Sequence, residues 1–204
     1  KLDHIEYASE ANFEIIETIK LINQITRKKL IDLKKLSNNN DFYSWFNNFL
    51  IKDIYLTLKE VEDNFLTENY NYEDKKIISQ SDVGFHNILL ENKCKNLFFI
   101  DFEYAGWDNP MKFISDWILQ PDSFFPEQKP LEFFQPLVNS VILDPNWKSN
   151  IKPYLLLYRL RWCLIISNKI FRLGDENKSA KKEIILKLKK YSEDSKNYIQ
   201  TLYN

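Results

Sequence analysis

The chain has 204 residues, enough for one domain or a small two-part unit, and its 44% hydrophobic and 15% aromatic residues can bury a substantial core. Its 28 Lys and Arg residues nearly balance its 29 Asp and Glu residues, so the net charge of -1 gives no electrostatic argument for a nucleic-acid partner. The sequence has no apolar stretch of the roughly 20 residues that a membrane span needs, and it shows no secretory signal, so no membrane partner is expected.

The first third of the sequence predicts two helices. Ser9 is expected to cap the first, in which apolar residues recur at helical spacing: Ala11, Ile15, Ile19 and Ile22. Residues 37–40 are polar and interrupt this pattern. Asp41 is then expected to cap a long second helix, whose apolar residues are Phe49, Ile54, Leu58, Val61 and Phe65.

The middle of the sequence changes to short extended segments. Residues 76–79 and 88–90 are candidate strands, and LFFID at 97–101 is a third. The polar residues 92–96 separate the last two and predict a hairpin turn. Residues 102–110 are expected to be irregular.

The last half predicts helices again. One helix is predicted over residues 111–119 and another from Pro130 through Val141. A third, apolar helix is predicted over 153–173, and Gly174 is expected to cap it. A final helix carries one apolar face, made of Ile184, Leu188, Tyr191, Tyr198 and Leu202. We therefore expect residues 1–204 to form a single, mainly α unit with a small β-hairpin, an α+β fold.

The cysteine and glycine content narrows the class further. Cys94 and Cys163 are far apart and have no ligand-like spacing, which favours a reduced, cytoplasmic protein over a disulfide scaffold. With only 3 glycines, the sequence has no GxGxxG or GxxxxGK phosphate loop. Because it begins with Lys1 and not with Met, we expect it to belong to a longer product.

Three features lie close together in the middle of the sequence. They are Asp82 followed by Asn87 after a four-residue gap, the predicted hairpin, and Asp101-Phe102-Glu103. A hairpin brings its two ends together, so we expect Asp82, Asn87 and Asp101 to converge. Carboxylate and amide oxygens are ligands that Mg²⁺ prefers. Phosphoryl transfer uses such groups, because it needs a carboxylate to orient the acceptor hydroxyl and ligands for nucleotide-bound Mg²⁺.

Two stretches carry a resemblance to a known superfamily. SDVGFHNILL (81–90) and LFFIDFEYAGWDNP (97–110) resemble the C-terminal lobe of the aminoglycoside phosphotransferase and choline/ethanolamine kinase superfamily. That superfamily has a His-x-Asp-x-x-x-x-Asn loop, a hairpin, and then an Ile-Asp-Phe/Trp-Glu/Asp-Tyr run. The matching motifs cover about residues 79–117. The resemblance implies a kinase-like C-terminal lobe and an ATP- and Mg²⁺-dependent transfer of phosphate to a hydroxyl of a small metabolite.

The resemblance also implies roles for individual residues. Asp82 matches the catalytic base, which takes the proton of the acceptor hydroxyl. Asn87 and Asp101 match the two Mg²⁺ ligands, and Asp101 would bridge the metal to the ATP phosphates. Glu103 matches a supporting Glu near metal or substrate, with a surface ion pair as the alternative. Asp116 matches an Asp that braces the catalytic loop, with a plain structural role as the alternative.

Two departures from the superfamily leave alternatives open. Gln80 stands where the family has a structural His, although Gln can donate a similar hydrogen bond. The N-terminal lobe that holds the nucleotide is absent from these residues, so the isolated chain should hold ATP poorly and a nucleotide-binding lobe is expected upstream. A catalytically inactive, kinase-derived binding or scaffolding module is therefore a second hypothesis. A helical interaction domain with fortuitous acidic residues is a third.

Other side chains admit a functional and a structural interpretation. His86 is either a substrate contact or a loop hydrogen-bonding residue. In YRLRWC (158–163), Arg159, Arg161 and Trp162 either reach a substrate or belong to the core, with the Arg side chains extending outward. A quaternary ammonium substrate would favour aromatic faces such as those of Trp107, Trp147 or Trp162.

Overall fold

The computed structural model describes residues 4–35, 40–65, 72–121, 130–173 and 177–203. These residues are mainly helical and include two small antiparallel sheets, which confirms the expected mainly α composition with a small β part. The chain divides into two compact units, one made of residues 1–14 with 70–154 and the other of residues 15–69 with 155–204. The expected single lobe over 1–204 stays a prediction.

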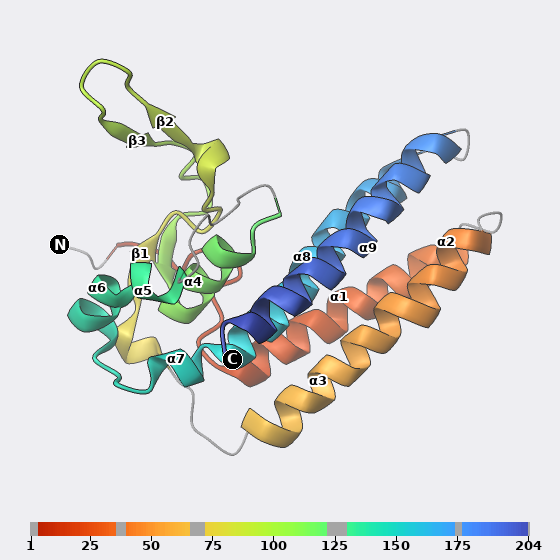
Figure 1. Ribbon diagram of the computed structural model, residues 1–204, viewed down its shortest axis with the longest axis horizontal. Helices are drawn as coiled ribbons and strands as arrows, with labels where there is room; N and C mark the ends of the chain where they lie inside the picture. Colours follow the sequence, from red (N-terminus) through yellow and green to blue (C-terminus); the bar gives the residue numbers. More distant parts are fainter. Residues whose placement is uncertain (1–3, 36–39, 66–71, 122–129, 174–176, 204) are drawn as a thin grey trace. The chain divides into compact units, whose positions relative to one another are not determined.

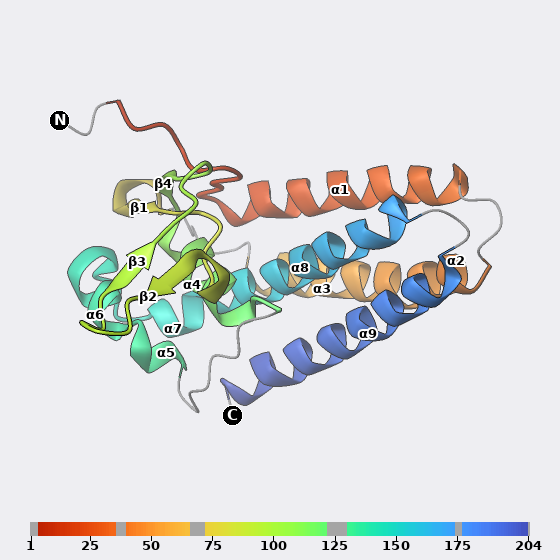
Figure 2. The ribbon, with the colours of Figure 1, turned by 90° about the horizontal axis from the view of Figure 1, so that it is seen from above.

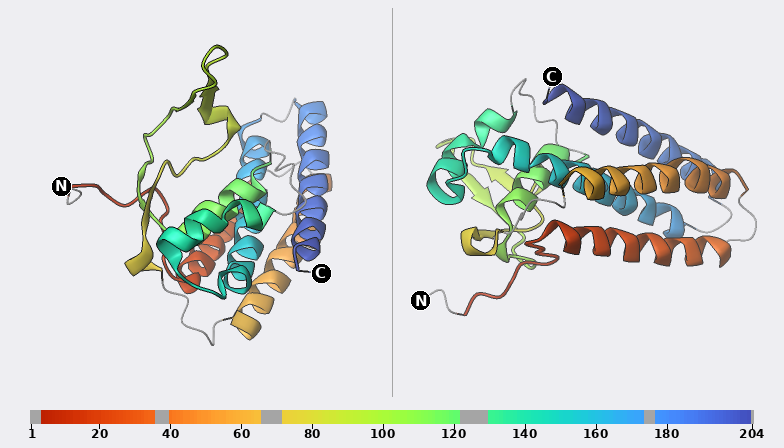
Figure 3. Two further views of the ribbon diagram at one scale, coloured as in Figure 1. Left: turned by 60° about the vertical axis from the view of Figure 1, so that its left-hand side comes forward. Right: turned by 90° about the horizontal axis from the view of Figure 1, so that it is seen from below.

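Long helices that lie side by side form the second unit (Figure 1, Figure 2 and Figure 3). A π-helical segment, η1, joins two of them, and α8 belongs to this unit from Leu155 onward. The helices are α1 (Ile15–Lys35), α2 (Asn40–Trp45), η1 (Phe46–Ile51), α3 (Lys52–Phe65), α8 (Lys152–Arg172) and α9 (Lys178–Thr201). The two helices predicted in the first third are thus present, but the second begins at Asn40, so Asp41 does not cap it. Gly174, the expected cap of α8, lies outside the described residues.

Apolar periodicity identifies the buried faces of these helices. The predicted stripes are buried at Ile15, Ile19 and Ile22 in α1 and at Ile54 in α3. α8 is buried on most sides, as its apolar sequence predicts. Burial of such faces supplies most of the stability of packed helices.

The start of α1 differs from the prediction. The helix begins at Ile15, so Ser9 does not cap it. The Ser9 amide instead donates to the Tyr104 carbonyl oxygen at 3.1 Å, and the Ala8 amide donates to the Trp107 carbonyl oxygen at 2.9 Å. Pairing with a distant part of the chain therefore replaces the local capping that the sequence suggested.

The first unit contains the two small sheets. β1 (Ile77–Ser79) pairs antiparallel with β4 (Gly106–Asp108), and residues next to Tyr7 run along the other edge of β4. The sequence predicted β1 but an irregular segment where β4 forms. A Cβ atom at Gly106 would overlap the backbone of this N-terminal segment, so the close approach requires glycine.

The second sheet is the predicted hairpin. β2 (Ile88–Leu90) pairs antiparallel with β3 (Leu97–Phe99), and Leu89 lies opposite Phe98. The hairpin projects away from β1 and α4 (Figure 1). Short helices complete the unit: η2 (Glu73–Lys75), η3 (Phe85–Asn87), α4 (Pro110–Leu119), α5 (Pro130–Phe133), α6 (Gln135–Leu137), π-helical η4 (Val138–Ile142) and α7 (Trp147–Asn150).

Two of the predicted helices in this unit have different outcomes. The helix predicted over 111–119 is confirmed as α4, which Asn109 caps by accepting a 2.8 Å hydrogen bond from the Met111 amide. The helix predicted from Pro130 through Val141 is broken into α5, α6 and η4. In the part of the chain that the structure describes, no helix is long and apolar enough to cross a membrane.

Candidate functional site

The loop between Asp82 and Asn87 is closed by the Asn87 side chain. Asn87 is buried, and its Nδ2 atom donates to the backbone carbonyl of Asp82 at 2.9 Å. Its backbone amide donates to the Gly84 carbonyl at 3.0 Å, which forms the short helix η3. The amide nitrogen of this side chain thus serves the loop, which leaves Oδ1 as the atom that suits a cation.

Hydrogen bonds join the two ends of the hairpin. The Ile100 amide donates to the Asn87 carbonyl at 3.0 Å. The Gln80 side-chain amide donates to the carbonyl of Ile100 and, at 3.3 Å, to that of Asp101. The backbone segments that carry Asp82, Asn87 and Asp101 are therefore neighbours, as hairpin geometry predicts.

Three acidic residues with predicted functional roles lie on the accessible side of this junction. The Asp82 side chain is 44% exposed, and Asp101 and Glu103 are exposed. A hydrogen bond to Glu103 raises the pKa of the Tyr104 hydroxyl, and the charges of Asp101 and Asp82 raise it further. The three carboxylates thus act on one phenol. In the described ranges, no group of three or more His, Cys, Asp or Glu side chains is arranged to hold a metal ion.

His86 links the loop to the end of α4. Its Nε2 atom lies 3.6 Å from Asp82 Oδ2, and its Nδ1 atom lies 3.0 Å from Gln120 Nε2. A Cβ atom at Gly84 would overlap the Gln120 side chain, which would then have to leave His86. These contacts favour the loop hydrogen-bonding interpretation of His86, and they place its ring beside the Asp82 carboxylate.

A buried ionic cluster lies under the same loop. The ammonium group of Lys112, a residue of α4 that is 1% exposed, lies 2.8 Å from Asp108 and 3.5 Å from Asp116. It also donates to Ser81 Oγ at 3.2 Å. Burial lowers the pKa of Lys112, but the charges of Asp116 and Asp108 outweigh this effect, and its pKa lies above the ordinary value. The group is therefore a charged lysine at neutral pH.

Sequence reasoning missed Lys112 and Asp108 as parts of this site. Asp116 was expected to brace the loop, but the side chain that reaches the loop in the structure is Lys112, which Asp116 holds at 3.5 Å. The available signal was the spacing Asp108-x-x-x-Lys112-x-x-x-Asp116, which places Lys112 and Asp116 on one face of an otherwise apolar helix and a second carboxylate just before that helix begins. An exposed helix has little need of such a ladder, whereas a buried one requires its charges to be paired.

The hairpin exposes an unusual amount of apolar surface. We call these residues the apolar arm, and each is between 49% and 58% exposed: Leu89, Leu90, Leu97, Phe98, Phe99 and Phe102. Both faces of the hairpin contribute, because Leu89 and Phe98 oppose each other on one face and Leu90 and Leu97 on the other. Contiguous exposed apolar surface of this kind is typical of an interaction site.

The other aromatic and basic candidates have structural surroundings. Arg159 is fully buried in the second unit and pairs with Asp53 at 2.7 Å, so the expectation that its side chain extends outward is wrong. Paired burial replaces outward extension because α8 is enclosed by its neighbours. The Lys76 ammonium lies 5.3 Å from the centre of the Trp107 ring, which is a cation–π contact within the protein.

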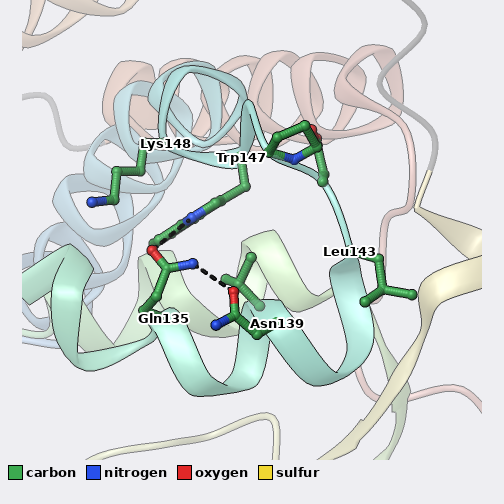
Figure 4. A pocket seen from close by; sticks show the side chains of 8 residues that line it. Gln135, Asn139, Leu143, Trp147 and Lys148 are labelled. Carbon is green, nitrogen blue, oxygen red and sulfur yellow. Dashed lines mark hydrogen bonds between the residues drawn. The ribbon is translucent and has the colours of Figure 1, made fainter.

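A separate surface cavity of about 490 Å³ lies between η4 and α7 (Figure 4). Gln135 accepts a hydrogen bond from the Trp147 indole at 3.4 Å and donates one to Asn139 at 2.8 Å. Trp147 is only 2% exposed, so it lines this cavity as a core residue and offers no open ring face. None of the residues proposed for phosphoryl transfer lines it.

No protein-family model and no curated protein matches this chain.

Proposed function

We propose that this chain is the catalytic and substrate-binding lobe of an ATP- and Mg²⁺-dependent phosphotransferase that acts on a hydroxyl of a small metabolite. The proposal rests on the sequence resemblance to the aminoglycoside phosphotransferase and choline/ethanolamine kinase superfamily. The observation that carries it is the junction at the base of the hairpin, where the backbone of Asn87 bonds Ile100 and the Gln80 side chain bonds Asp101. These hydrogen bonds make neighbours of the backbone segments that carry the residues with proposed roles.

In this proposal Asp82 takes the proton of the acceptor hydroxyl. Its carboxylate is partly accessible, which suits a group that must meet a substrate. His86, at 3.6 Å, lies on one side of it and orients the carboxylate. Asp82 does not have to be buried for this role, because an Asp that orients the acceptor in phosphoryl transfer acts mainly through its position.

Asn87 and Asp101 would hold Mg²⁺, with Glu103 in support. The donor set fits, because it consists of a carboxylate and an amide oxygen, and the amide nitrogen of Asn87 is already used within the loop. Protein sites for Mg²⁺ usually supply only one or two carboxylates, with water and phosphate oxygens completing the shell. When bound, the metal would neutralise charge on the nucleotide phosphates.

The contacts of Gln80 favour an active enzyme over an inactive module. The structural role of the family His is hydrogen bonding, and Gln80 donates two such bonds to the backbone beside Asp101. Replacement of His by Gln therefore preserves the connection between the loop and the hairpin end. An inactive binding module remains the competing function because the His itself is missing.

The apolar arm supports the proposed upstream nucleotide-binding lobe as the partner of this chain. An isolated two-stranded hairpin is marginally stable in water, and half-exposed Leu and Phe side chains on both faces gain stability when covered. The first residue of the arm, Leu89, lies two positions after Asn87, and its last residue, Phe102, directly follows Asp101. A lobe that covers it would lie beside the proposed Mg²⁺ ligands, where ATP must be held.

The direct test is phosphoryl transfer from ATP by the longest natural form of the protein against a panel of sugars, amino alcohols and polysaccharide precursors. Asp82→Asn and Asp101→Asn should each lower turnover by about 100-fold or more. Asp63→Asn is the matched control, because Asp63 is an exposed carboxylate in α3. Near-normal turnover in both site variants would refute the proposal.

Titration with Mg²⁺-ATP separates the two candidate functions. An active enzyme should bind the nucleotide in a Mg²⁺-dependent manner and lose that dependence in Asp101→Asn. An inactive module should bind weakly or without regard to Mg²⁺, and should show no transfer to any acceptor.

A further inference from the structure

A strained turn immediately precedes Asp82. Ser81 adopts a left-handed backbone with φ of 67°, and the Asp82 amide donates to the Gln80 carbonyl at 2.9 Å. A hydrogen bond between residues two apart around a positive φ defines a γ-turn of the rare, strained class. Serine has no special tolerance for this region, so the turn persists only if its surroundings hold it.

Hydrogen bonds from three directions hold Ser81. Its Oγ atom donates to the Ser9 carbonyl at 3.1 Å and accepts from Lys112 Nζ at 3.2 Å. Its backbone amide donates to Ser79 Oγ at 3.0 Å, and Ser79 Oγ in turn donates to Asp108 Oδ2 at 2.7 Å. Both the side chain and the backbone of Ser81 are thus connected to the buried ionic cluster.

The Lys112 ammonium group has three hydrogens and three acceptors around it. Two of these are the carboxylates of Asp108 and Asp116, and the third is Ser81 Oγ. Two carboxylates would suffice to compensate the buried charge. The third contact is directed at the one residue that has a strained backbone next to Asp82.

We infer that Lys112 is a positioning residue: it fixes the Ser81 turn and thereby sets the direction of the Asp82 carboxylate. It acts through Ser81 and has no contact with the reacting atoms in this scheme. The inference rests on the proposed function only in that Asp82 is taken as the catalytic base. Asp108 supports the same turn from both sides, since it pairs with Lys112 and accepts from Ser79.

The test uses two variants that remove the same contact from opposite ends. Ser81→Ala deletes the hydroxyl and leaves the ionic cluster complete, so it should fold even if Lys112→Met does not. Ser140→Ala is the matched control, because Ser140 is an exposed residue of the same unit whose hydroxyl also donates to a backbone carbonyl, that of Leu137, at 3.0 Å.

The first readout is amide hydrogen exchange, which needs no activity. Ser81→Ala and Lys112→Met should each speed exchange of the Asp82 amide by about tenfold. In Ser81→Ala the amides in β1, β4 and α4 should keep their rates, because only the turn is released. Unchanged exchange at Asp82, or an equal increase throughout the first unit, would overturn the inference. The Ser140→Ala control should leave the Asp82 amide unaffected.

The second readout is the separation of kcat from KM in protein that transfers phosphate. Ser81→Ala should lower kcat by about 10- to 100-fold and leave KM for Mg²⁺-ATP nearly unchanged, since a misplaced base affects chemistry more than binding. Faster local exchange with an unchanged kcat would overturn the positioning role. If exchange is faster in the variants but the wild-type protein transfers phosphate to no acceptor, the proposed function is overturned and the role of Lys112 in fixing the turn is supported.

Discussion

The side-chain amide of Gln80 donates a hydrogen bond to the backbone carbonyl of Asp101 at 3.3 Å. The same amide also bonds the carbonyl of Ile100, so one buried side chain connects the loop before β2 with the end of β3. Asp101 itself has a left-handed backbone with φ of 64°, a conformation that Asp tolerates better than most residues. The two proposed functional segments are therefore held together by a residue that makes no catalytic contact.

Replacement of Gln80 should reveal whether its role is donation. Gln80→Glu keeps the shape but presents a carboxylate to two carbonyl oxygens, so the free energy of unfolding should fall by about 1–3 kcal/mol. Gln80→His retains a donor and should cost less than about 1 kcal/mol. Urea denaturation of the three proteins measures both values. Equal losses in the two variants would show that the donated hydrogen bonds are unimportant.

The Arg159 and Asp53 pair should dominate the electrostatic stability of the second unit. Arg159 donates to Asp53 Oδ2 at 2.7 Å and to Thr57 Oγ1 at 3.1 Å from a fully buried position. Asp53→Ala leaves the buried guanidinium without its carboxylate and should cost about 3–5 kcal/mol in unfolding free energy. Denaturant titration of the variant provides the measurement.

Lys196 provides an internal control for that prediction. Its ammonium lies 3.7 Å from the other oxygen of Asp53, but its side chain is 54% exposed. Lys196→Ala should therefore cost less than about 1 kcal/mol, because exposed ion pairs are screened by water. A similar cost for Lys196→Ala and Asp53→Ala would contradict the importance assigned to burial.

Local patterns and non-local contacts differ in how well the sequence predicts them. The stripe of Ile15, Ile19 and Ile22 and the strands flanking the turn at 92–96 follow from periodicity and turn chemistry, and the structure confirms them. β4 could not be predicted in this way, because it exists through pairing with β1 and with the segment around Tyr7. The prediction that Ser9 caps a helix is wrong for the same reason, because non-local pairing determines the structure around Ser9.

The candidate site shows the same division. The neighbourhood of Asp82, Asn87 and Asp101 was predictable because a hairpin necessarily brings its ends together. The γ-turn at Ser81 was not predictable, since the sequence contains no glycine or asparagine at that position. Lys112 looks like a solvated helix residue in the sequence, and its burial becomes apparent only when α4 packs beneath the loop.

Lys29 should give the second unit a pH-dependent stability. Burial lowers its pKa from 10.5 to about 8, beside Asn168 and over the ring of Phe171. Between pH 8 and 10.5 the unfolded chain then binds more protons than the folded chain at this site, so its contribution to stability rises with pH over that window. Below pH 8 both states are protonated and the burial penalty is fully present.

The difference between wild-type protein and Lys29→Met measures this effect. Denaturant titrations from pH 7 to pH 10.5 should show the wild type gaining stability relative to the variant, because methionine cannot titrate. Lys20→Met on the exposed side of α1 is the control and should run parallel to the wild type. A constant difference between wild type and Lys29→Met across this pH range would refute the prediction.

The apolar arm should contribute to association far more than to the stability of the chain itself. Leu89 and Phe98 oppose each other and are 54% and 53% exposed. Replacing both with Thr keeps a residue that favours strands and removes apolar surface, so the free energy of unfolding should change by no more than about 0.5 kcal/mol per site. Self-association, measured by light scattering, should decrease.

Leu186→Thr is the matched control, because Leu186 in α9 is similarly exposed at 57% and lies outside the hairpin. It should leave self-association unchanged. In protein that contains the proposed nucleotide-binding lobe, the Leu89 and Phe98 double variant should also weaken Mg²⁺-ATP binding, since that lobe would lose its contact with the hairpin. A loss of more than about 2 kcal/mol in the double variant would instead show that these side chains are packed inside the chain, contrary to their exposure.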